Sequence, residues 1–181
     1  FWEAGARCFY TTSKPIRSVE DLKGMKIRVQ QTEVAISMVR ALGAEATPMD
    51  YAEVFQGLQT GIVDGAENDF VSYYTSGHYE VAKYYSLDQH MAPPAVLLMS
   101  KASWDKMTEA QQEAVRKAAY EAAVWQRQAM QDYQLESRAA CEAAGCEIIE
   151  VDVPSFQAAV ASVYDEYPQY KTIVDMINAV E

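Results

Sequence analysis

The chain has 181 residues, 15 Lys and Arg against 26 Asp and Glu, a formal net charge of −11 and 50% hydrophobic residues. This hydrophobic fraction supports a folded core and argues against a disordered chain. The acidic balance argues against nucleic acid or an anionic membrane as a partner, although one cleft can still concentrate a few arginines on an anion. The sequence contains no run of about 18 to 20 apolar residues, the length of a membrane-spanning helix.

Strands and short helices alternate in the first part of the chain. The Ser-x-x-Asp pattern at Ser18 predicts one helical turn that ends at Gly24, and a strand follows over 26–29 with Arg28 near its carboxyl end. Further elements are expected as a helix over 32–42, a strand over 44–49, a helix over 52–60 and a strand over 62–66. This order predicts an α/β fold with a largely parallel sheet.

The middle of the chain predicts one unusually long helix. The pair Thr108 and Gln111 forms a capping box, and no Pro or Gly follows until Gly145. A helix of about 35 residues spans roughly 50 Å, which exceeds one small lobe. The remaining expected elements are a helix over 69–76, strands over 84–87 and 95–99, a strand over 147–151, a helix capped by Ser155 and a last helix over 168–180.

The three cysteines are Cys8, Cys141 and Cys146. Their odd number, and the absence of any CxxC or histidine-rich spacing, argue against a metal site. Cys141 and Cys146 flank the expected helix end at Gly145. A short-loop disulfide and a pair of half-buried thiols both remain open for them.

Polar and aromatic side chains at expected strand ends suggest a ligand cleft. An arginine at the position of Arg28 can grip a carboxylate through two parallel hydrogen bonds, although a solvated arginine produces the same pattern. Asn68 offers a donor and an acceptor to a ligand or caps a turn. Tyr51 supplies a flat apolar face to a ligand or packs in the core.

Catalytic patterns are weak. His78 and His90 have no triad or metal spacing, so we expect structural roles for both. A hydrolase that uses Glu67 and a histidine is an alternative of another class, and Glu67 with Asp69 makes an acid/base pair only by special geometry. A scaffold built on the long helix is a third alternative. We expect no cofactor, since the chain has no Gly-rich phosphate loop.

Several motifs occur together in one order. They include DLKGMKIRV at 21–29 and VDGAEN at 63–68, and others stand at 11–16, 41–44, 53–61, 79–84 and 104–107. In this order, over nearly the whole chain, they resemble the solute-binding proteins of tripartite ATP-independent periplasmic (TRAP) transporters, of the DctP type. One departure is Asp69, which stands where that family usually has Pro.

The resemblance implies a periplasmic-binding-protein-like fold of two α/β lobes with a long helix across both. It implies that this chain is the C-terminal part, that the N-terminal lobe is largely missing, and that a signal peptide lies outside it. The expected division is 1–92 as the second lobe with the ligand clamp, 93–145 as a crossover strand and the inter-lobe helix, and 146–181 as a C-terminal strand and helices that pack on the lobes.

The resemblance also implies site residues. Arg28 resembles the carboxylate-clamping arginine, and Asn68 the asparagine that closes on the ligand. Arg7 lies near the place of a second ligand arginine. The whole expected ligand-binding set is Arg28, Asn68, Arg7, Tyr51, Glu67, Phe70 and His90. No metal and no catalytic residue is expected.

The implied function is capture of a small organic acid in the periplasm and its delivery to the membrane subunits of a TRAP permease, without catalysis. We favour a sugar acid such as a hexuronate, because Asp69, Ser72, Tyr73 and Tyr74 offer partners for hydroxyls and stacking faces for a sugar. A C4-dicarboxylate or a 2-oxo acid is the alternative within the family.

Overall fold

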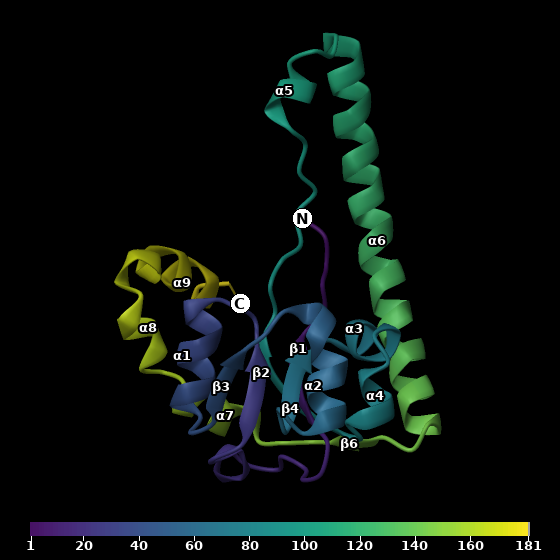
Figure 1. Ribbon diagram of the computed structural model, residues 1–181. Helices are drawn as coiled ribbons and strands as arrows, with labels where there is room; N and C mark the ends of the chain where they lie inside the picture. The colour runs from purple at the N-terminus through teal and green to yellow at the C-terminus, as the bar shows by residue number, and fades with distance from the viewer. Residues whose placement is uncertain (181) are drawn as a thin grey trace.

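The computed structural model describes residues 1–180, and at its centre lies a sheet with the strand order β3-β2-β4-β1-β5-β6 (Figure 1). The strands are β1 (Arg7–Thr11), β2 (Lys26–Val29), β3 (Glu45–Pro48), β4 (Gly65–Asn68), β5 (Tyr84–Met91) and β6 (Glu147–Ile149). β2 pairs in parallel with β3 and β4, and β5 with β6, whereas β1 runs antiparallel to β4 and β5. The sheet is therefore mixed, and the expectation of a largely parallel sheet missed β1.

Helices cover both faces of the sheet. They are η1 (Val19–Leu22), α1 (Glu33–Ala41), η2 (Tyr51–Glu53), α2 (Val54–Thr60), α3 (Phe70–Thr75), α4 (His78–Val81), α5 (Lys101–Trp104), α6 (Glu109–Ala143), α7 (Val153–Ala159), α8 (Val163–Glu166), η3 (Pro168–Tyr170) and α9 (Lys171–Asn178). The core on one face joins α2, α3 and the end of α6 around Tyr10, Tyr73 and Tyr85. The core on the other face joins α1 and α7 around Phe9 and Ile27.

Local signals explain several of these elements. The capping boxes at Ser18 and Thr108 both form, and Thr32 accepts a hydrogen bond from the Ala35 amide at the start of α1. α1 is followed by Gly43, whose φ of +84° suits a residue without a side chain. The long helix is confirmed at 35 residues.

Other expectations were wrong. The strand expected over 62–66 begins at Gly65, because the chain first turns at Gly61 with a φ of +73°. Ser155 does not cap α7. Asp152 holds the cap position, and the Ser155 hydroxyl donates back to its carbonyl oxygen at 2.7 Å.

The segment 95–99 does not form the expected strand. A strand needs a neighbour for its backbone groups, and among the described residues only Ala95 has one, through a bridge to Trp2. Leu97 and Leu98 are 62% and 82% exposed. The local pattern is that of a strand, but no partner strand lies beside it in residues 1–180.

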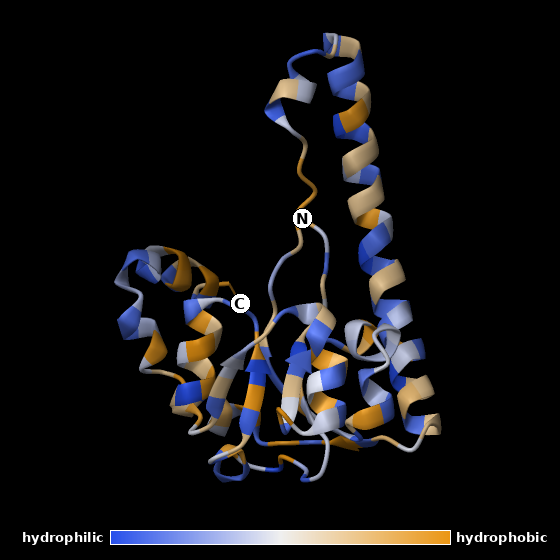
Figure 2. Ribbon diagram, viewed as in Figure 1, coloured by the Kyte–Doolittle hydropathy of each residue, from blue (hydrophilic) through white to orange (hydrophobic). Residues whose placement is uncertain are grey.

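α6 projects well beyond the sheet (Figure 1). Its carboxyl end packs against α3, whereas Tyr120 and Trp125 on the projecting part are each 72% exposed. Figure 2 shows apolar residues along this part and along the neighbouring segment 94–99. No helix in residues 1–180 has both the length and the apolar character required to cross a membrane.

Candidate functional site

The topology gathers the expected site residues at one edge of the sheet. β2 and β4 end there, and β1 begins there because it is antiparallel, so that Cys8 pairs with Asn68 and Arg7 with Met91. Ligands of open α/β sheets bind beyond the carboxyl ends of such strands. The projecting part of α6 extends on this same side (Figure 1).

Arg28 is buried at this edge without a carboxylate partner. Its side chain is on the face of α2, since Ile27 and Val29 on either side point to the core of α1. Its Nε and Nη2 donate to the Met49 carbonyl oxygen at 3.0 and 2.8 Å, and no acidic side chain within residues 1–180 forms an ion pair with it. Burial lowers the pKa of this guanidinium below its usual value.

Asn68 ends the neighbouring strand on the same face as Arg28. Gly65 of β4 lies beside Ile27, which places Arg28 next to Ala66 and two residues short of Asn68. Strand geometry then separates the two Cβ atoms by about 8 Å. The Asn68 Oδ1 accepts from the Asp69 amide at 3.0 Å, and its backbone oxygen accepts from Tyr85. The remaining Nδ2 group can donate to a ligand.

Tyr51 lies beside Arg28, as expected of a ligand-facing aromatic. The guanidinium carbon is 5.8 Å from the centroid of its ring, and the residue is 46% exposed. Its hydroxyl is hydrogen-bonded to the Ser76 hydroxyl, which fixes the ring.

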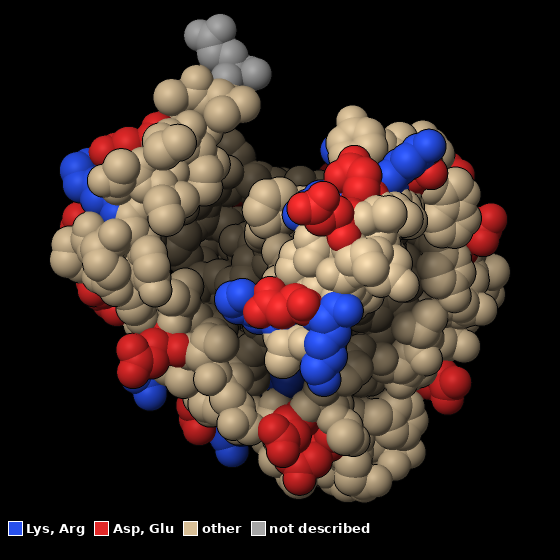
Figure 3. All heavy atoms as spheres, turned by 90° about the horizontal axis from the view of Figure 1, so that it is seen from above, with Lys and Arg blue, Asp and Glu red and all other residues tan. Residues whose placement is uncertain are grey.

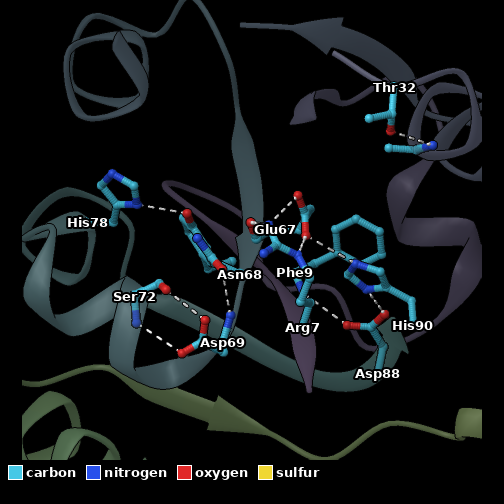
Figure 4. Close-up of polar contacts among 12 residues, drawn as sticks. Arg7, Phe9, Thr32, Glu67, Asn68, Asp69, Ser72, His78, Asp88 and His90 are labelled. Atoms are coloured by element: carbon cyan, nitrogen blue, oxygen red, sulfur yellow. Dashed lines mark hydrogen bonds and ion pairs between the residues drawn. The ribbon is translucent and has the colours of Figure 1, made fainter. Parts of the chain in front are cut away.

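The buried residues Tyr10 and His78 are hydrogen-bonded to each other, and the His78 ring packs against Tyr51. His78 is 1% exposed and its Nδ1 is 2.8 Å from the Tyr10 hydroxyl (Figure 4). Burial, with a contribution from the charge of Arg28, lowers the pKa of His78 to about 4. The structural role expected for His78 is confirmed.

Arg7 lies on the opposite face and is already neutralised. Its Nε and Nη2 donate to the two carboxylate oxygens of Glu67 at 2.5 and 2.9 Å, and Nη2 also donates to the Glu67 backbone oxygen at 3.1 Å (Figure 4). Both side chains are less than 10% exposed. The structure therefore joins Arg7 and Glu67 to each other, with geometry that holds the Glu67 carboxylate charged.

His90 extends this ion pair. Its Nδ1 is 2.6 Å from Asp88 Oδ2, its ring stacks on Phe9 at 4.2 Å, and its Nε2 is 3.5 Å from Glu67 Oε2, longer than a normal hydrogen bond. Nε2 is buried and has no hydrogen-bond partner among the described residues.

The charges around His90 change its protonation. Burial by itself lowers the pKa of His90, but Asp88 and Glu67 outweigh it and raise the pKa to about 9. For Glu67 burial raises the pKa, and His90 and Arg7 together bring it below its usual value. At neutral pH the cluster therefore holds two cations against two carboxylates.

Asp88 is the member of this buried charged cluster that the sequence interpretation missed. It is 1% exposed, and its Oδ1 also accepts from the Phe9 amide at 2.9 Å. The pairing of β1 with β5 shifts register here, and Gln89 has a φ of +49°. This bulge turns the Asp88 side chain inward, where its carboxylate accepts the Phe9 amide hydrogen in place of a backbone oxygen of the neighbouring strand. Its position two residues before His90 was the available signal.

Phe70 and its neighbours serve the fold. The Phe70 ring stacks on Tyr85 at 4.0 Å in the core, and Tyr73 is fully buried. Asp69 caps α3 by accepting from the Ser72 amide, and it also accepts from the Ser72 hydroxyl at 2.7 Å. The Tyr73 hydroxyl donates to the Ala82 carbonyl oxygen. These bonds argue against contact of Asp69, Ser72 and Tyr73 with the hydroxyls of a sugar, while contact of Tyr74 with a sugar stays a prediction.

The edge of the sheet opens onto a hollow. Seen from above, the molecule has a deep hollow whose visible walls are mostly neither acidic nor basic (Figure 3). An apolar pocket beside His90 lies between α1 and the C-terminal helices, and neither Arg28 nor Asn68 lines it. Its lining includes Val34, Met38, Met91, Val163, Tyr164 and Tyr167. Within residues 1–180 no group of acidic, cysteine or histidine side chains has the arrangement of a metal site.

Comparisons with known proteins find solute-binding proteins that are similar to this chain. A solute-binding protein of Chromohalobacter salexigens is 43% identical over 180 residues, which cover 97% of this chain and 54% of that protein. A solved TRAP periplasmic solute-binding protein of Xanthobacter autotrophicus, with bound β-D-galacturonate, is 47% identical with a TM-score of 0.94 over 100% of this chain and 61% of its own. One from Chromohalobacter salexigens, with bound D-glucuronate, is 40% identical with a TM-score of 0.96 over 99% and 62%.

The chain spans about half the length of the curated relatives it matches. Its fold is accordingly part of the two-lobe fold of the solved TRAP proteins. The model of the bacterial extracellular solute-binding proteins, family 7 (DctP), matches residues 1–170. Together with the similarity to the solved structures, this match shows that the chain belongs to the DctP family of TRAP solute-binding proteins.

Proposed function

We propose that this chain is the carboxylate-binding part of a periplasmic protein that captures a hexuronate and delivers it to a TRAP permease. The observation that carries the proposal is Arg28. A guanidinium that is 3% exposed and bonded only to a backbone oxygen among the described residues lacks the anion that a buried cation requires. A ligand carboxylate supplies it.

The geometry supports a specific mode of capture. The Met49 carbonyl oxygen takes Nε and one Nη2 hydrogen of Arg28, so the other N–H groups remain for a carboxylate. The Asn68 amide, on the same face, donates to the same ligand. When the cleft closes and water leaves, these hydrogen bonds strengthen because the local dielectric constant falls.

Relatives support a hexuronate as the ligand. The Xanthobacter and Chromohalobacter proteins were solved with D-galacturonate and D-glucuronate, and they match almost the whole of this chain. Since Asp69 and Ser72 are bonded to each other, we infer that sugar hydroxyls are recognised by other groups, including the part of the relatives' length that this chain does not span.

The exposed apolar surface supports the expected division of the chain. Leu97, Leu98 and Trp125 are the kind of side chains that a second lobe covers, and 93–145 would join that lobe to the lobe formed by 1–92. In this arrangement 146–181 completes the sheet through β6 and packs beside α1. The ligand lies between the lobes.

Calorimetry with the full protein tests this function. We expect D-glucuronate and D-galacturonate to bind and to raise the melting temperature, while succinate and pyruvate leave it unchanged. A ligand at a hundred times its Kd adds about 2.7 kcal/mol to the free energy of unfolding. Binding of succinate or pyruvate alone would refute the hexuronate assignment.

The proposal also excludes catalysis. After prolonged incubation with the protein, the nuclear magnetic resonance spectrum of D-glucuronate should be unchanged. Conversion of the sugar acid would instead support the hydrolase alternative with Glu67, whose carboxylate Arg7 already holds.

A further inference from the structure

The carboxyl end of α6 brings two cysteines together. After the helix, Gly145 has a φ of +85°, the left-handed conformation that follows many helix ends. The Gly145 amide donates to the Glu142 carbonyl oxygen at 3.0 Å, and the Cys146 amide donates to the Cys141 carbonyl oxygen at 3.0 Å. This pair of bonds is a Schellman motif, in which side chains at the positions of Cys141 and Cys146 commonly pack together, and both cysteines belong to the same buried cluster.

The backbone bond limits how far apart the two cysteines are. With 3.0 Å between Cys146 N and Cys141 O, ordinary bond lengths keep the two Cα atoms within about 7 Å. Disulfides join cysteines whose Cα atoms are about 4.4 to 6.8 Å apart. The backbone geometry therefore places the two residues within reach of a disulfide. Burial raises the pKa of the Cys141 thiol to about 12, and the nearby Cys146 thiol adds to the shift.

Both cysteines are buried, and Cys146, which follows the end of α6, is the more exposed of the two. Cys141 is fully buried and Cys146 is 8% exposed. The Cys146 sulfur accepts from the Tyr73 hydroxyl at 3.3 Å and donates weakly to the Tyr79 carbonyl oxygen at 3.6 Å. Only this weak bond of the thiol hydrogen is lost if the sulfur is oxidised.

We propose that Cys141 and Cys146 are a disulfide site, which is free in this structure and closes when the protein meets a disulfide oxidant such as oxidised glutathione. Closure joins the carboxyl end of α6 to the start of β6. The long helix, half of which projects from the sheet, is then covalently held at its packed end.

The reaction is thiol–disulfide exchange. The Cys146 thiol, which is the more exposed, loses its proton to water and attacks one sulfur of the oxidant, whose other half leaves as a thiolate. When the last turn of α6 frays, the Cys141 thiolate attacks the Cys146 sulfur and releases the second half. The cysteine pair loses two protons and two electrons, and the oxidant disulfide is reduced to two thiols.

Cys8 is an internal control for this chemistry. It is 2% exposed on β1, where it pairs with Asn68, and it is remote in sequence from the Schellman motif. Burial raises the pKa of its thiol to about 12. Among the three cysteines of this sequence, the expected product therefore retains only Cys8 as a free thiol.

Mass spectrometry of the full protein tests the proposal. The protein is equilibrated with oxidised glutathione, quenched with acid, denatured and treated with N-ethylmaleimide. We expect a mass lower by about 2 Da before labelling, two fewer maleimide adducts than in the reduced protein, and a peptide that links Cys141 to Cys146. The melting temperature should rise by about 5 °C relative to the reduced protein.

Single variants separate this pair from other reactions. Cys8→Ala should still form the disulfide and lose two adducts on oxidation, whereas Cys141→Ala and Cys146→Ala should each lose none. An unchanged number of adducts in the oxidised wild-type protein, retained glutathione, or a link to Cys8 would each overturn the proposal. The result on the wild-type protein stands even if a variant folds poorly.

Discussion

Two arginines at the same edge of the sheet have opposite environments. Arg7 donates three hydrogen bonds to Glu67, whereas Arg28 donates two to the backbone oxygen of Met49. Burial lowers the pKa of both guanidiniums, but Glu67 reverses the effect for Arg7, whose pKa is raised, while that of Arg28 stays lowered. Two buried cations of one type thus differ in their partners: Arg7 is part of an ion pair with Glu67, whereas Arg28, which we propose as the ligand arginine, donates only to a backbone oxygen among the described residues.

The largest expected effect comes from Arg28→Ala. Without the guanidinium, a ligand carboxylate is buried unpaired, which costs about 3 to 5 kcal/mol, or at least a hundredfold in affinity for D-glucuronate. Isothermal titration calorimetry measures it. Arg28→Lys keeps the charge but loses the forked geometry, so its affinity should fall between the two.

Arg17→Ala is the matched control, because this arginine is exposed and pairs with Glu147 on the surface. Its affinity should equal that of the wild-type protein. Near-native binding by Arg28→Ala would contradict the distinction between the two arginines at the edge.

Arg7→Met should instead weaken the fold. The substitution leaves Glu67 buried without its cation, and such a loss costs about 3 to 5 kcal/mol of the free energy of unfolding. Urea denaturation of the ligand-free protein measures it. The double variant Arg7→Met with Glu67→Leu should recover much of the loss. An Arg7→Met protein of unchanged stability would show that this pair is dispensable.

His90 makes the Arg7 side sensitive to alkaline pH. Its pKa is about 9 in the folded protein and 6.5 without the fold, so its charged contacts stabilise fully below pH 6.5 and are lost as the pH rises through 9. We expect the free energy of unfolding to fall by about 1 to 3 kcal/mol across that window. His90→Gln should remove this dependence, and an unchanged profile in that variant would assign it to another group.

The smallest expected effect on ligand affinity comes from Tyr51, whose ring lies beside Arg28. A half-exposed ring beside a guanidinium contributes about 0.5 to 1 kcal/mol. Tyr51→Leu should therefore weaken D-glucuronate binding a few-fold in calorimetry. Tyr51→Phe keeps the ring but loses the hydroxyl bond to Ser76 that fixes it, so its affinity should lie between those of Tyr51→Leu and the wild-type protein.

The sequence by itself determined what local chemistry controls. Capping boxes at Ser18 and Thr108 and the absence of Pro and Gly through 109–143 placed helix starts and the long helix correctly. The ordered motifs, among them the one at 21–29, identified the family, and they suggested Arg28 as the ligand arginine, which stays a prediction. The polar run after Asn68 suggested a sugar, but two of its members, Asp69 and Ser72, bond to each other within the fold.

Only the tertiary structure decided which groups meet. The antiparallel insertion of β1 brings Arg7 to Glu67, and the bulge at Gln89 turns Asp88 toward His90. Both depend on pairing between strands distant in sequence, which no local pattern encodes. The segment 95–99 illustrates the converse, because it has a strand's pattern and, within residues 1–180, no neighbour to pair with. The sequence pointed to Arg7 and Arg28 as candidate ligand residues. The pairing of β1 with β4 gave Glu67 to Arg7 and left Arg28 without a carboxylate partner among the described residues.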